Sequence, residues 1–336
     1  MKLYVLCPQG LVTGGAEALH QLVHHARNLG QDANICYYDR SEQVTEAYRH
    51  YNVAVTRVPL DSSDAAVVVA ETHPEGLAGI NRARRVVWWL SVDNYFAARE
   101  PEASPPYDDT SDFLAGLCHP SKQIIHLAQS EYARQFLLRR EVRPRMLTDY
   151  LSAPFLARAA GAQQQPKKDV VLYNPKKGLA FTERLIDASK GVLEWVPIQG
   201  LSADGVAELL AESKLYVDFG EHPGRDRIPR EAAISGCCVI TGTRGAAGND
   251  IDIPIPRRFV LDEDMPDVVQ RFIELSMDTM RRFDEVSAEF ASYRETIANQ
   301  EKLFAEEVAA FVAAMSRPLL KGAPIGRYRG KKRRKR

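Results

Sequence analysis

Charged side chains that could bind a nucleotide are concentrated in residues 221–231. Arginine presents a fork of donors that matches phosphate oxygens, and a carboxylate can accept hydrogen bonds from both hydroxyls of a ribose. A histidine in the same segment could act as a base or contact a phosphate. This density of charge predicts a phosphate- or nucleotide-binding segment. The side chains are Glu221, His222, Arg225, Asp226, Arg227, Arg230 and Glu231.

The charged segment connects two apolar stretches with the character of buried strands, residues 214–219 and 237–241. Pro229 suits the first turn of a helix, where its missing N–H is not needed, and Gly236 suits the helix end. The predicted order is therefore strand, loop, short helix and strand. In doubly wound α/β sheets, loops at the carboxyl ends of the strands form the ligand crevice, and the next helix offers free N–H groups to an anion.

Each of these side chains also has a purely structural interpretation. Glu231, in a first helical turn, would stabilise the helix dipole without any ligand. One or two of the arginines could be ordinary surface charges, and a single histidine on a loop is usually neither a base nor a ligand. The position of His222 beside an expected crevice is what makes it a candidate.

Two further turns follow predicted strands and precede predicted helices. The first, PQGLVTGG, contains Gly14 and Gly15, which would let the backbone approach a phosphate or a sugar. The second, NPKKG at residues 174–178, places Lys176 and Lys177 where they could neutralise a diphosphate. The alternative interpretation of the first segment is a tight turn that binds no ligand, and that of the second is a turn whose lysines are only solvated.

Apolar stretches alternate with helical patterns along the whole chain, which predicts parallel sheets covered on both faces. A low-complexity segment at residues 159–168 predicts a domain boundary, and residues 91–110 are predicted to be a long loop. Expected strands lie at residues 2–7, 33–38, 53–58, 65–70, 85–90, 123–128, 169–173 and 192–196; expected helices lie at 16–29, 130–139, 179–189, 202–212, 266–280 and 283–315.

Charge is distributed unevenly. The 336 residues include 44 basic and 44 acidic side chains, but residues 318–336 hold nine basic residues and no acid, which leaves 35 basic against 44 acidic residues on the rest. Each basic residue near an anionic membrane surface contributes about 1 kcal/mol, so this tail could hold an acidic body on a membrane. Nucleic acid would attract the tail too, but Tyr328 is its only aromatic residue, which argues against RNA.

The five cysteines form no C-x-x-C motif, and four of them lie in apolar stretches, which indicates buried thiols in a reducing compartment and no zinc site. The N-terminal segment is too short and too soon interrupted for a signal peptide, and no apolar stretch approaches the roughly 18 residues needed to span a bilayer. We therefore expect a cytoplasmic protein that is peripheral at the inner face of the membrane.

Three segments resemble the retaining GT-B glycosyltransferases, particularly the large family 4 group. They are GGAE at residues 14–17, the Lys177-Gly178 pair, and PREAAISGCCVI at residues 229–240. SEYARQFL at residues 130–137 is similar to the last strand and helix of that family's first domain. The order and spacing of these segments are more specific than any one of them.

The resemblance implies an α/β fold of GT-B architecture, in which two Rossmann-like, doubly wound parallel-sheet domains face a cleft. The expected parts are an acceptor-side domain at residues 1–160, a nucleotide-sugar-binding domain at 165–298, a helix at 299–317 that packs back on the first domain, and the basic tail at 318–336. The implied activity is transfer of a sugar from a nucleotide-activated donor to a glycan or lipid-linked acceptor, with retention, in cell-surface polysaccharide or glycolipid synthesis.

Site residues follow from the same resemblance. The expected catalytic residues are His222, Arg225 and Lys177; the expected donor-binding residues are Gly14, Gly15, Asn174, Lys177, Gly178, Arg227, Arg230 and Glu231. Lys177 would bind the diphosphate and Glu231 the ribose. This sequence departs from the family pattern at Pro223, where the family has a second glutamate, at Asn174, where it has an arginine, and at Ser91, where it often has a histidine.

No D-x-D metal motif is evident in the predicted nucleotide-binding segments, so we expect no metal and no cofactor besides the nucleotide-sugar donor. A GT-B transferase that uses a CMP-activated acid sugar is a second interpretation, because a His-Pro pair binds the nucleotide phosphate in some enzymes of that kind. A non-catalytic scaffold that binds a nucleotide or a glycan is a third. A scaffold would bind nucleotide without hydrolysing the donor.

Overall fold

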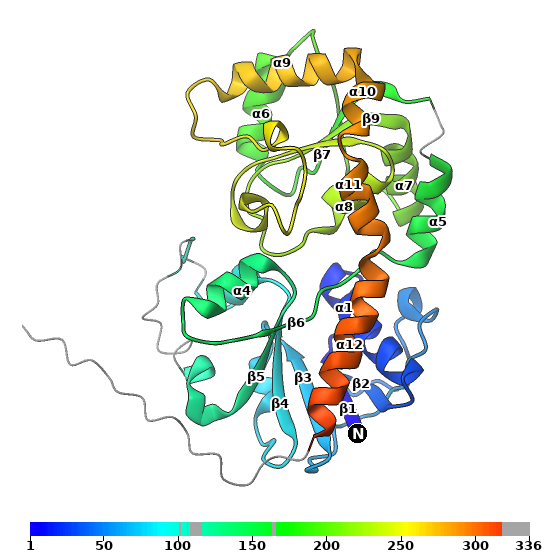
Figure 1. The fold of residues 1–336 in the computed structure, drawn as a ribbon, viewed down its shortest axis with the longest axis vertical. Coiled ribbons are helices and arrows are strands. Elements are labelled where there is room, and N and C mark those ends of the chain that lie inside the picture. Colours follow the sequence, from blue (N-terminus) through cyan, green and yellow to red (C-terminus); the bar gives the residue numbers. More distant parts are fainter. Residues whose placement is uncertain (101, 106, 108–115, 163–165, 318–336) are drawn as a thin grey trace, which may run out of the picture.

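Two α/β units lie one above the other in the computed structural model, with the N-terminal unit below in Figure 1. The structure describes residues 1–100, 102–105, 107, 116–162 and 166–317. The basic tail at residues 318–336, expected to contact a membrane, lies outside the described residues.

The first unit is built on a parallel sheet with the strand order β2-β1-β3-β4-β5-β6. Its strands β1, β3 and β4 are almost continuously apolar and buried, as a sheet covered on both faces requires. The strands are β1 (Lys2–Cys7), β2 (Asp32–Tyr37), β3 (Ala65–Ala70), β4 (Arg84–Trp89), β5 (Ile124–Ala128) and β6 (Arg145–Met146), and its helices include α1 (Gly14–Asn28), α2 (Val92–Ala97) and α4 (Glu131–Leu138).

The second unit contains a parallel sheet with the order β10-β9-β7-β8. Its strands are β7 (Lys168–Tyr173), β8 (Glu194–Pro197), β9 (Ser213–Asp218) and β10 (Cys238–Thr241). Around them lie α6 (Leu179–Ala188), α7 (Ala203–Glu212), α8 (Arg227–Ile234), α9 (Val268–Arg281), α10 (Phe283–Ala288) and α11 (Ala291–Ala298). Gly236, with φ of 90°, follows the end of α8 as the sequence predicted.

The chain crosses between the units twice. Helix α5 (Ala153–Ala162) belongs to the second hydrophobic core, to which it contributes Phe155 and Ala159. The second core therefore begins before the boundary at residue 160 that the low-complexity segment suggested. Helix α12 (Gln300–Ser316) returns to the first unit and packs Phe304 and Phe311 into the core beside α1. Figure 1 shows α11 beside the second unit and α12 continuing below it along the side of the first unit.

Three local predictions were wrong. Residues 53–58 form no strand; only an isolated bridge joins Val55 to Ile35. The expected loop after β4 begins with helix α2, because the Ser91 side chain accepts a hydrogen bond from the Asn94 N–H and caps it. The expected helix at residues 283–315 is divided into α10, α11 and α12. No helix among the described residues is long and apolar enough to cross a membrane.

Candidate functional site

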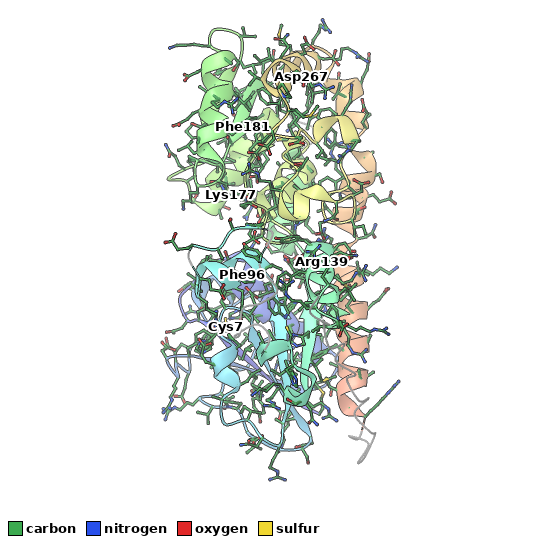
Figure 2. All side chains as sticks on the ribbon, turned by 90° about the vertical axis from the view of Figure 1, so that its left-hand side faces the viewer. Cys7, Phe96, Arg139, Lys177, Phe181 and Asp267 are labelled. Atoms are coloured by element: carbon green, nitrogen blue, oxygen red, sulfur yellow. The ribbon has the colours of Figure 1, made fainter. Side chains whose placement is uncertain are left out.

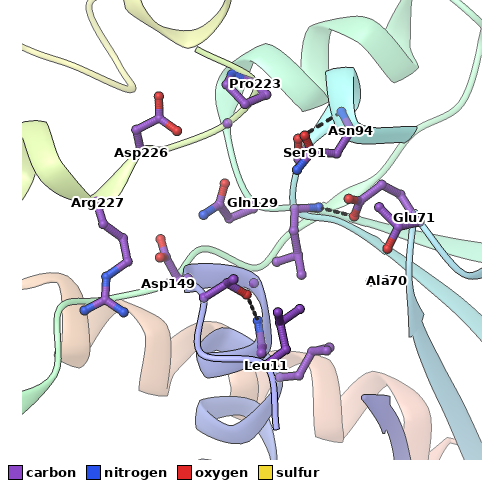
Figure 3. Close-up of a pocket in the computed structure, with 18 of the residues that line it drawn as sticks. Leu11, Ala70, Glu71, Ser91, Asn94, Gln129, Asp149, Pro223, Asp226 and Arg227 are labelled. Atoms are coloured by element: carbon purple, nitrogen blue, oxygen red, sulfur yellow. Dashed lines mark hydrogen bonds between the residues drawn. The ribbon is translucent and has the colours of Figure 1, made fainter. Parts of the chain in front are cut away.

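A cavity of about 910 Å³ lies between the two units, where the carboxyl ends of their strands face each other. Figure 3 shows Asp226 and Arg227 of the second unit on one side of it and Glu71 of the first unit on the other. Such a crevice is where open α/β sheets bind ligands. The polar residues of its lining include Thr13, Glu71, Thr72, His73, Ser91, Asn94, Gln129, Asp149, Asn174, Lys176, Lys177, Arg225, Asp226 and Arg227.

Three helices begin at or beside this cavity. Gly14 and Gly15 open α1, Lys177 precedes the start of α6, and Asp226 and Arg227 open α8. Each helix N-terminus carries roughly half a positive charge and unpaired N–H groups. The backbone thus adds to the charge of the lysine and arginine side chains, and the whole arrangement favours a polyanion.

Direct contacts close the two units on each other around the cavity. The Val92 N–H donates to the Pro223 carbonyl over 3.0 Å, and the Arg225 N–H donates to the Gln129 side chain over 3.0 Å. At the start of α4, the Asp252 carboxylate accepts the N–H of Glu131 at 2.8 Å. Residues of the first unit therefore contact the second unit directly beside the cavity.

Arg227 forms ion pairs with one residue of each unit. Its guanidinium pairs with Glu17 of α1 and lies 3.2 Å from Glu231 of its own helix. A Cβ at Gly14 would lie 2.9 Å from the Arg227 side chain, so a larger residue at position 14 would force that side chain to move. Burial opposes the charged guanidinium, but the two carboxylates outweigh it and raise the pKa of Arg227. Burial, only partly offset by Arg227, raises the pKa of Glu231.

A second buried charge cluster, here called the Lys177 cluster, consists of Lys177, Asp218, His222, Asp226 and Tyr216. The Lys177 ammonium pairs with Asp226 and lies 3.7 Å from Asp218. His222 places Nδ1 2.9 Å from Asp226 and Nε2 3.1 Å from the Asp218 carbonyl, and Tyr216 donates to Asp218 over 2.8 Å. Because His222 is 0% exposed, it cannot touch a ligand in this structure. It acts on the cavity through Asp226.

Charge balance explains the protonation states in the Lys177 cluster. Burial disfavours charge on His222 and Lys177, but Asp218 and Asp226 outweigh it and raise the pKa of both. Burial would raise the pKa of Asp226, but His222 and Lys177 lower it. Two carboxylates thus face an ammonium and an imidazolium. Asp218, His222 and Asp226 could together bind a metal ion, yet Lys177 already neutralises that space.

The raised pKa of His222 predicts a pH-dependent contribution to stability. Protonation stabilises the fold fully below the unfolded histidine pKa of about 6.5, and this contribution is lost as pH rises through the higher folded value. The stability difference between the wild-type protein and His222→Asn should therefore be larger at pH 6 than at pH 9. Urea unfolding at both pH values measures it; an equal difference at both would show that His222 is neutral.

Of the predicted arginines, Arg230 belongs to the junction between the units, whereas Arg225 lines the cavity and lies close to that junction. Arg230 is 1% exposed and donates to Asp149 at 2.7 Å and to Gln300 at 3.1 Å. Arg225 contributes to the cavity lining, but the charges that act on its guanidinium are those of Arg230, Asp149 and Asp252. Burial, reinforced by Arg230, lowers the pKa of Arg225. Arg230 fixes the places where the chain passes between the units.

The remaining predicted residues lie at or directly behind the cavity wall. Gly14, Gly15, Asn174 and Lys177 line it, together with Arg225 and Arg227. Gly178, with φ of 53°, is the N-cap of α6 and meets the backbone of Phe219, where an added Cβ would lie 2.2 Å from the carbonyl oxygen. Gly178 therefore serves close packing. Glu231 lies behind Arg227, and His222 behind Asp226.

Sequence reasoning left several polar residues of the lining unassigned, among them Glu71, Gln129 and Asp226. Glu71 follows β3 and accepts the Leu90 N–H over 2.8 Å, while Gln129 follows β5. Burial raises the pKa of Glu71 to about 7. Asp226 was noted among the charged side chains but was not assigned to the site. Position directly after a strand was the available signal for Glu71 and Gln129.

No protein-family model and no curated protein matches this chain. Among solved structures, the sucrose-phosphate synthase of Thermosynechococcus elongatus matches with a TM-score of 0.65 and 9% identity over 94% of this chain and 99% of that chain. The E. coli trehalose-6-phosphate structure bound with UDP-2-fluoro glucose has a TM-score of 0.62 and 8% identity over 95% and 100%. TarM, from S. aureus, has a TM-score of 0.54 and 12% identity over 75% and 55%, so the chain spans about half of its length.

These likenesses, together with the two parallel sheets, show the fold. The chain has the GT-B architecture of glycosyltransferases, with two Rossmann-like units facing a cleft. The predicted fold class is confirmed.

Proposed function

We propose that this chain is a glycosyltransferase that moves a sugar from a nucleotide-activated donor to an acceptor hydroxyl. One observation carries the proposal: Lys177, Arg227 and the starts of α1, α6 and α8 converge on one cavity between the units. A nucleoside diphosphate is a ligand that such a site favours. A similar fold in the E. coli trehalose-6-phosphate structure binds UDP-2-fluoro glucose, which supports the same donor class here.

The proposed chemistry is stabilisation of a departing diphosphate. Lys177 exchanges its pairing with Asp226 for a phosphate oxygen, and Asp226 keeps its charge partner in His222. Arg227 turns from Glu231 toward the same phosphates, which frees Glu231 to accept the ribose hydroxyls. Cations aimed at charge that develops in the transition state are an effective catalytic device. Because the Lys177 cluster supplies this charge, we propose that transfer needs no metal and no cofactor beyond the donor.

On the basis of the sequence resemblance, we also propose that the chain belongs to family 4, that it transfers a hexose and that it retains the configuration of the donor sugar. We also propose a glycan or lipid-linked acceptor in cell-surface polysaccharide or glycolipid synthesis, and a cytoplasmic, peripheral location. Incubation with UDP-, GDP-, ADP- and CMP-sugars tests the activity. Release of nucleotide supports a transferase, preference for a CMP-sugar would favour the second interpretation, and nucleotide binding without turnover would indicate a scaffold.

Removal of the Glu231 carboxylate should weaken nucleotide binding by roughly ten- to a hundredfold, because hydrogen bonds to charged groups contribute about 1.5–3 kcal/mol. Thermal shift and calorimetric titration with UDP and uridine, comparing Glu231→Ala with the wild-type protein, measure the effect. The fold should change little, since Arg227 keeps Glu17 as a partner. Exposed Glu208 on α7 provides the control Glu208→Ala. Unchanged UDP affinity in Glu231→Ala would rule out the ribose assignment.

The basic tail predicts attraction to anionic membranes. Deletion of Lys321–Arg336 should abolish binding to vesicles that contain phosphatidylserine while sparing transfer to a water-soluble acceptor. Binding by the full chain should fall as salt rises, since the Debye length is about 8 Å at physiological ionic strength. Co-sedimentation at several salt concentrations measures this. Vesicle binding that survives the deletion, or a stronger preference for RNA at equal salt, would contradict the prediction.

A further inference from the structure

A second cavity lies at the junction of the units, on the side of α4. It measures about 720 Å³ and is lined from both units. Arg139, at the end of α4, lies where the two units meet, on the opposite side of the junction from Lys177 in Figure 2. The lining residues are Ser104, Pro105, Tyr107, Tyr132, Phe136, Arg139 and Arg140 of the first unit, and Glu221, Arg244 and Gly245 of the second.

The 910 Å³ cavity described above is here called the donor cavity. The hydrogen bond from the Val92 N–H to the Pro223 carbonyl lies between it and the second cavity. On the first unit, Asn94 lines the donor cavity, whereas its neighbour Asp93 accepts the hydroxyl of Tyr132 at 2.9 Å. On the second unit, Pro223 lines the donor cavity and Glu221 lines the second cavity. A single turn of each unit therefore separates the two spaces, and a ligand of several rings could contact both.

Arginine side chains line the second cavity from both units. Arg139 is exposed and has no ion-pair partner among the described residues. Arg244 is 45% exposed, with Glu221 at 3.5 Å and Glu263 at 3.6 Å, both at the long end of ion-pair distances. Weakly paired guanidinium groups such as those of Arg139 and Arg244 suit a phosphate or a carboxylate.

The same cavity offers groups that suit a sugar ring. The Oε2 atom of Glu221 is buried and has no hydrogen-bond partner in the described part of the chain. A buried acceptor without a partner is unfavourable, and a ligand hydroxyl would satisfy it. The Tyr132 side chain, held by Asp93, adds a fixed aromatic surface. Anion-binding guanidinium groups, a free carboxylate oxygen and an aromatic ring together match a carbohydrate that carries an acidic group.

We propose that the second cavity binds the acidic group and adjoining ring of an anionic carbohydrate, such as a sugar phosphate or a uronic acid, as the acceptor of the reaction. Arg139 and Arg244 contact the anion, and Glu221 accepts a ring hydroxyl. The role as acceptor rests on the proposed function; the binding site itself does not. Binding of the sugar is therefore measured without nucleotide. A failure of the proposed binding site can then be distinguished from a failure of the proposed glycosyltransferase function.

The test is calorimetric titration of the full chain with glucose 6-phosphate, glucuronic acid, inorganic phosphate and glucose. At least one of the two anionic sugars should bind at least tenfold more tightly than glucose and than inorganic phosphate. Arg139→Gln combined with Arg244→Gln should weaken that sugar at least tenfold and leave UDP binding within twofold. Arg258→Gln, an exposed arginine of the second unit, is the matched control. Thermal unfolding confirms that the variants fold.

Glu221→Gln separates sugar recognition from simple anion binding. It should reduce the preference for the anionic sugar over inorganic phosphate at least threefold, while phosphate itself binds no more weakly. Three outcomes would overturn the proposal: neither anionic sugar binds more tightly than glucose, phosphate binds as tightly as the sugars, or binding is lost in Lys177→Ala but not in the arginine double variant. The last outcome would place the anion in the donor cavity.

Discussion

Substitution of Lys177 by alanine should lower the turnover of donor by roughly a hundred- to a thousandfold, the loss that follows removal of one preorganised donor to developing charge. The reason is geometric. Lys177 is the lysine that lines the donor cavity from inside a charge cluster, with Asp226 and Asp218 beside it and the start of α6 behind it. Without it, the departing diphosphate would face Asp226 unscreened.

The effect of Lys177→Ala on binding should differ between a nucleoside diphosphate and the nucleoside alone. Because Lys177 meets the diphosphate and not the nucleoside, Lys177→Ala should weaken UDP at least tenfold more than it weakens uridine. Single-turnover assays and calorimetry measure the two effects, and Lys190→Ala, at an exposed lysine of the same unit, controls for charge. Equal weakening of UDP and uridine would mean that Lys177 is structural. In that case Arg227 becomes the candidate for the diphosphate.

The sequence was sufficient for the fold because the determining signals are local. The apolar stretches that became β1, β3, β4 and β9 are buried on both faces, and Gly10 and Gly220 mark the turns after β1 and β9. Helix α2 was missed because its signal is a single capping serine, Ser91, in an otherwise polar segment. The segment at residues 53–58 was predicted to be a strand because its alternating apolar residues satisfy the same pattern, yet only Val55 bridges to β2.

The site could be located from the sequence, but the tasks of its residues could not be assigned. Asn174, Lys177 and Arg227 were placed at the cavity by their positions between strand and helix. The burial of His222 depends on Asp218, Asp226 and Lys177 closing over it, and only tertiary structure shows that arrangement. A charged loop residue looks the same in sequence whether it faces a ligand or a junction.

Arg230 is the clearest such case, and it gives the prediction with the largest effect on stability. Its guanidinium holds three separate parts of the chain: Asp149 before α5, Gln300 at the start of α12, and the Arg225 carbonyl before α8, the last at 2.8 Å. The first two are the places where the chain passes between units. Arg230→Met would leave the Asp149 carboxylate, which is 3% exposed, without this partner.

We therefore expect Arg230→Met to lower the free energy of unfolding by about 3–5 kcal/mol, the cost of leaving one partner of a buried ion pair uncompensated. Arg258→Met, which breaks an exposed pair with Glu289, should cost no more than about 1 kcal/mol. The double variant Arg230→Met with Asp149→Leu should be more stable than Arg230→Met alone, because it buries no unpaired charge. Urea unfolding measures all three. If Arg230→Met proves as mild as Arg258→Met, the pair with Asp149 does not hold the units together, and Arg230 returns to the candidates for binding the donor.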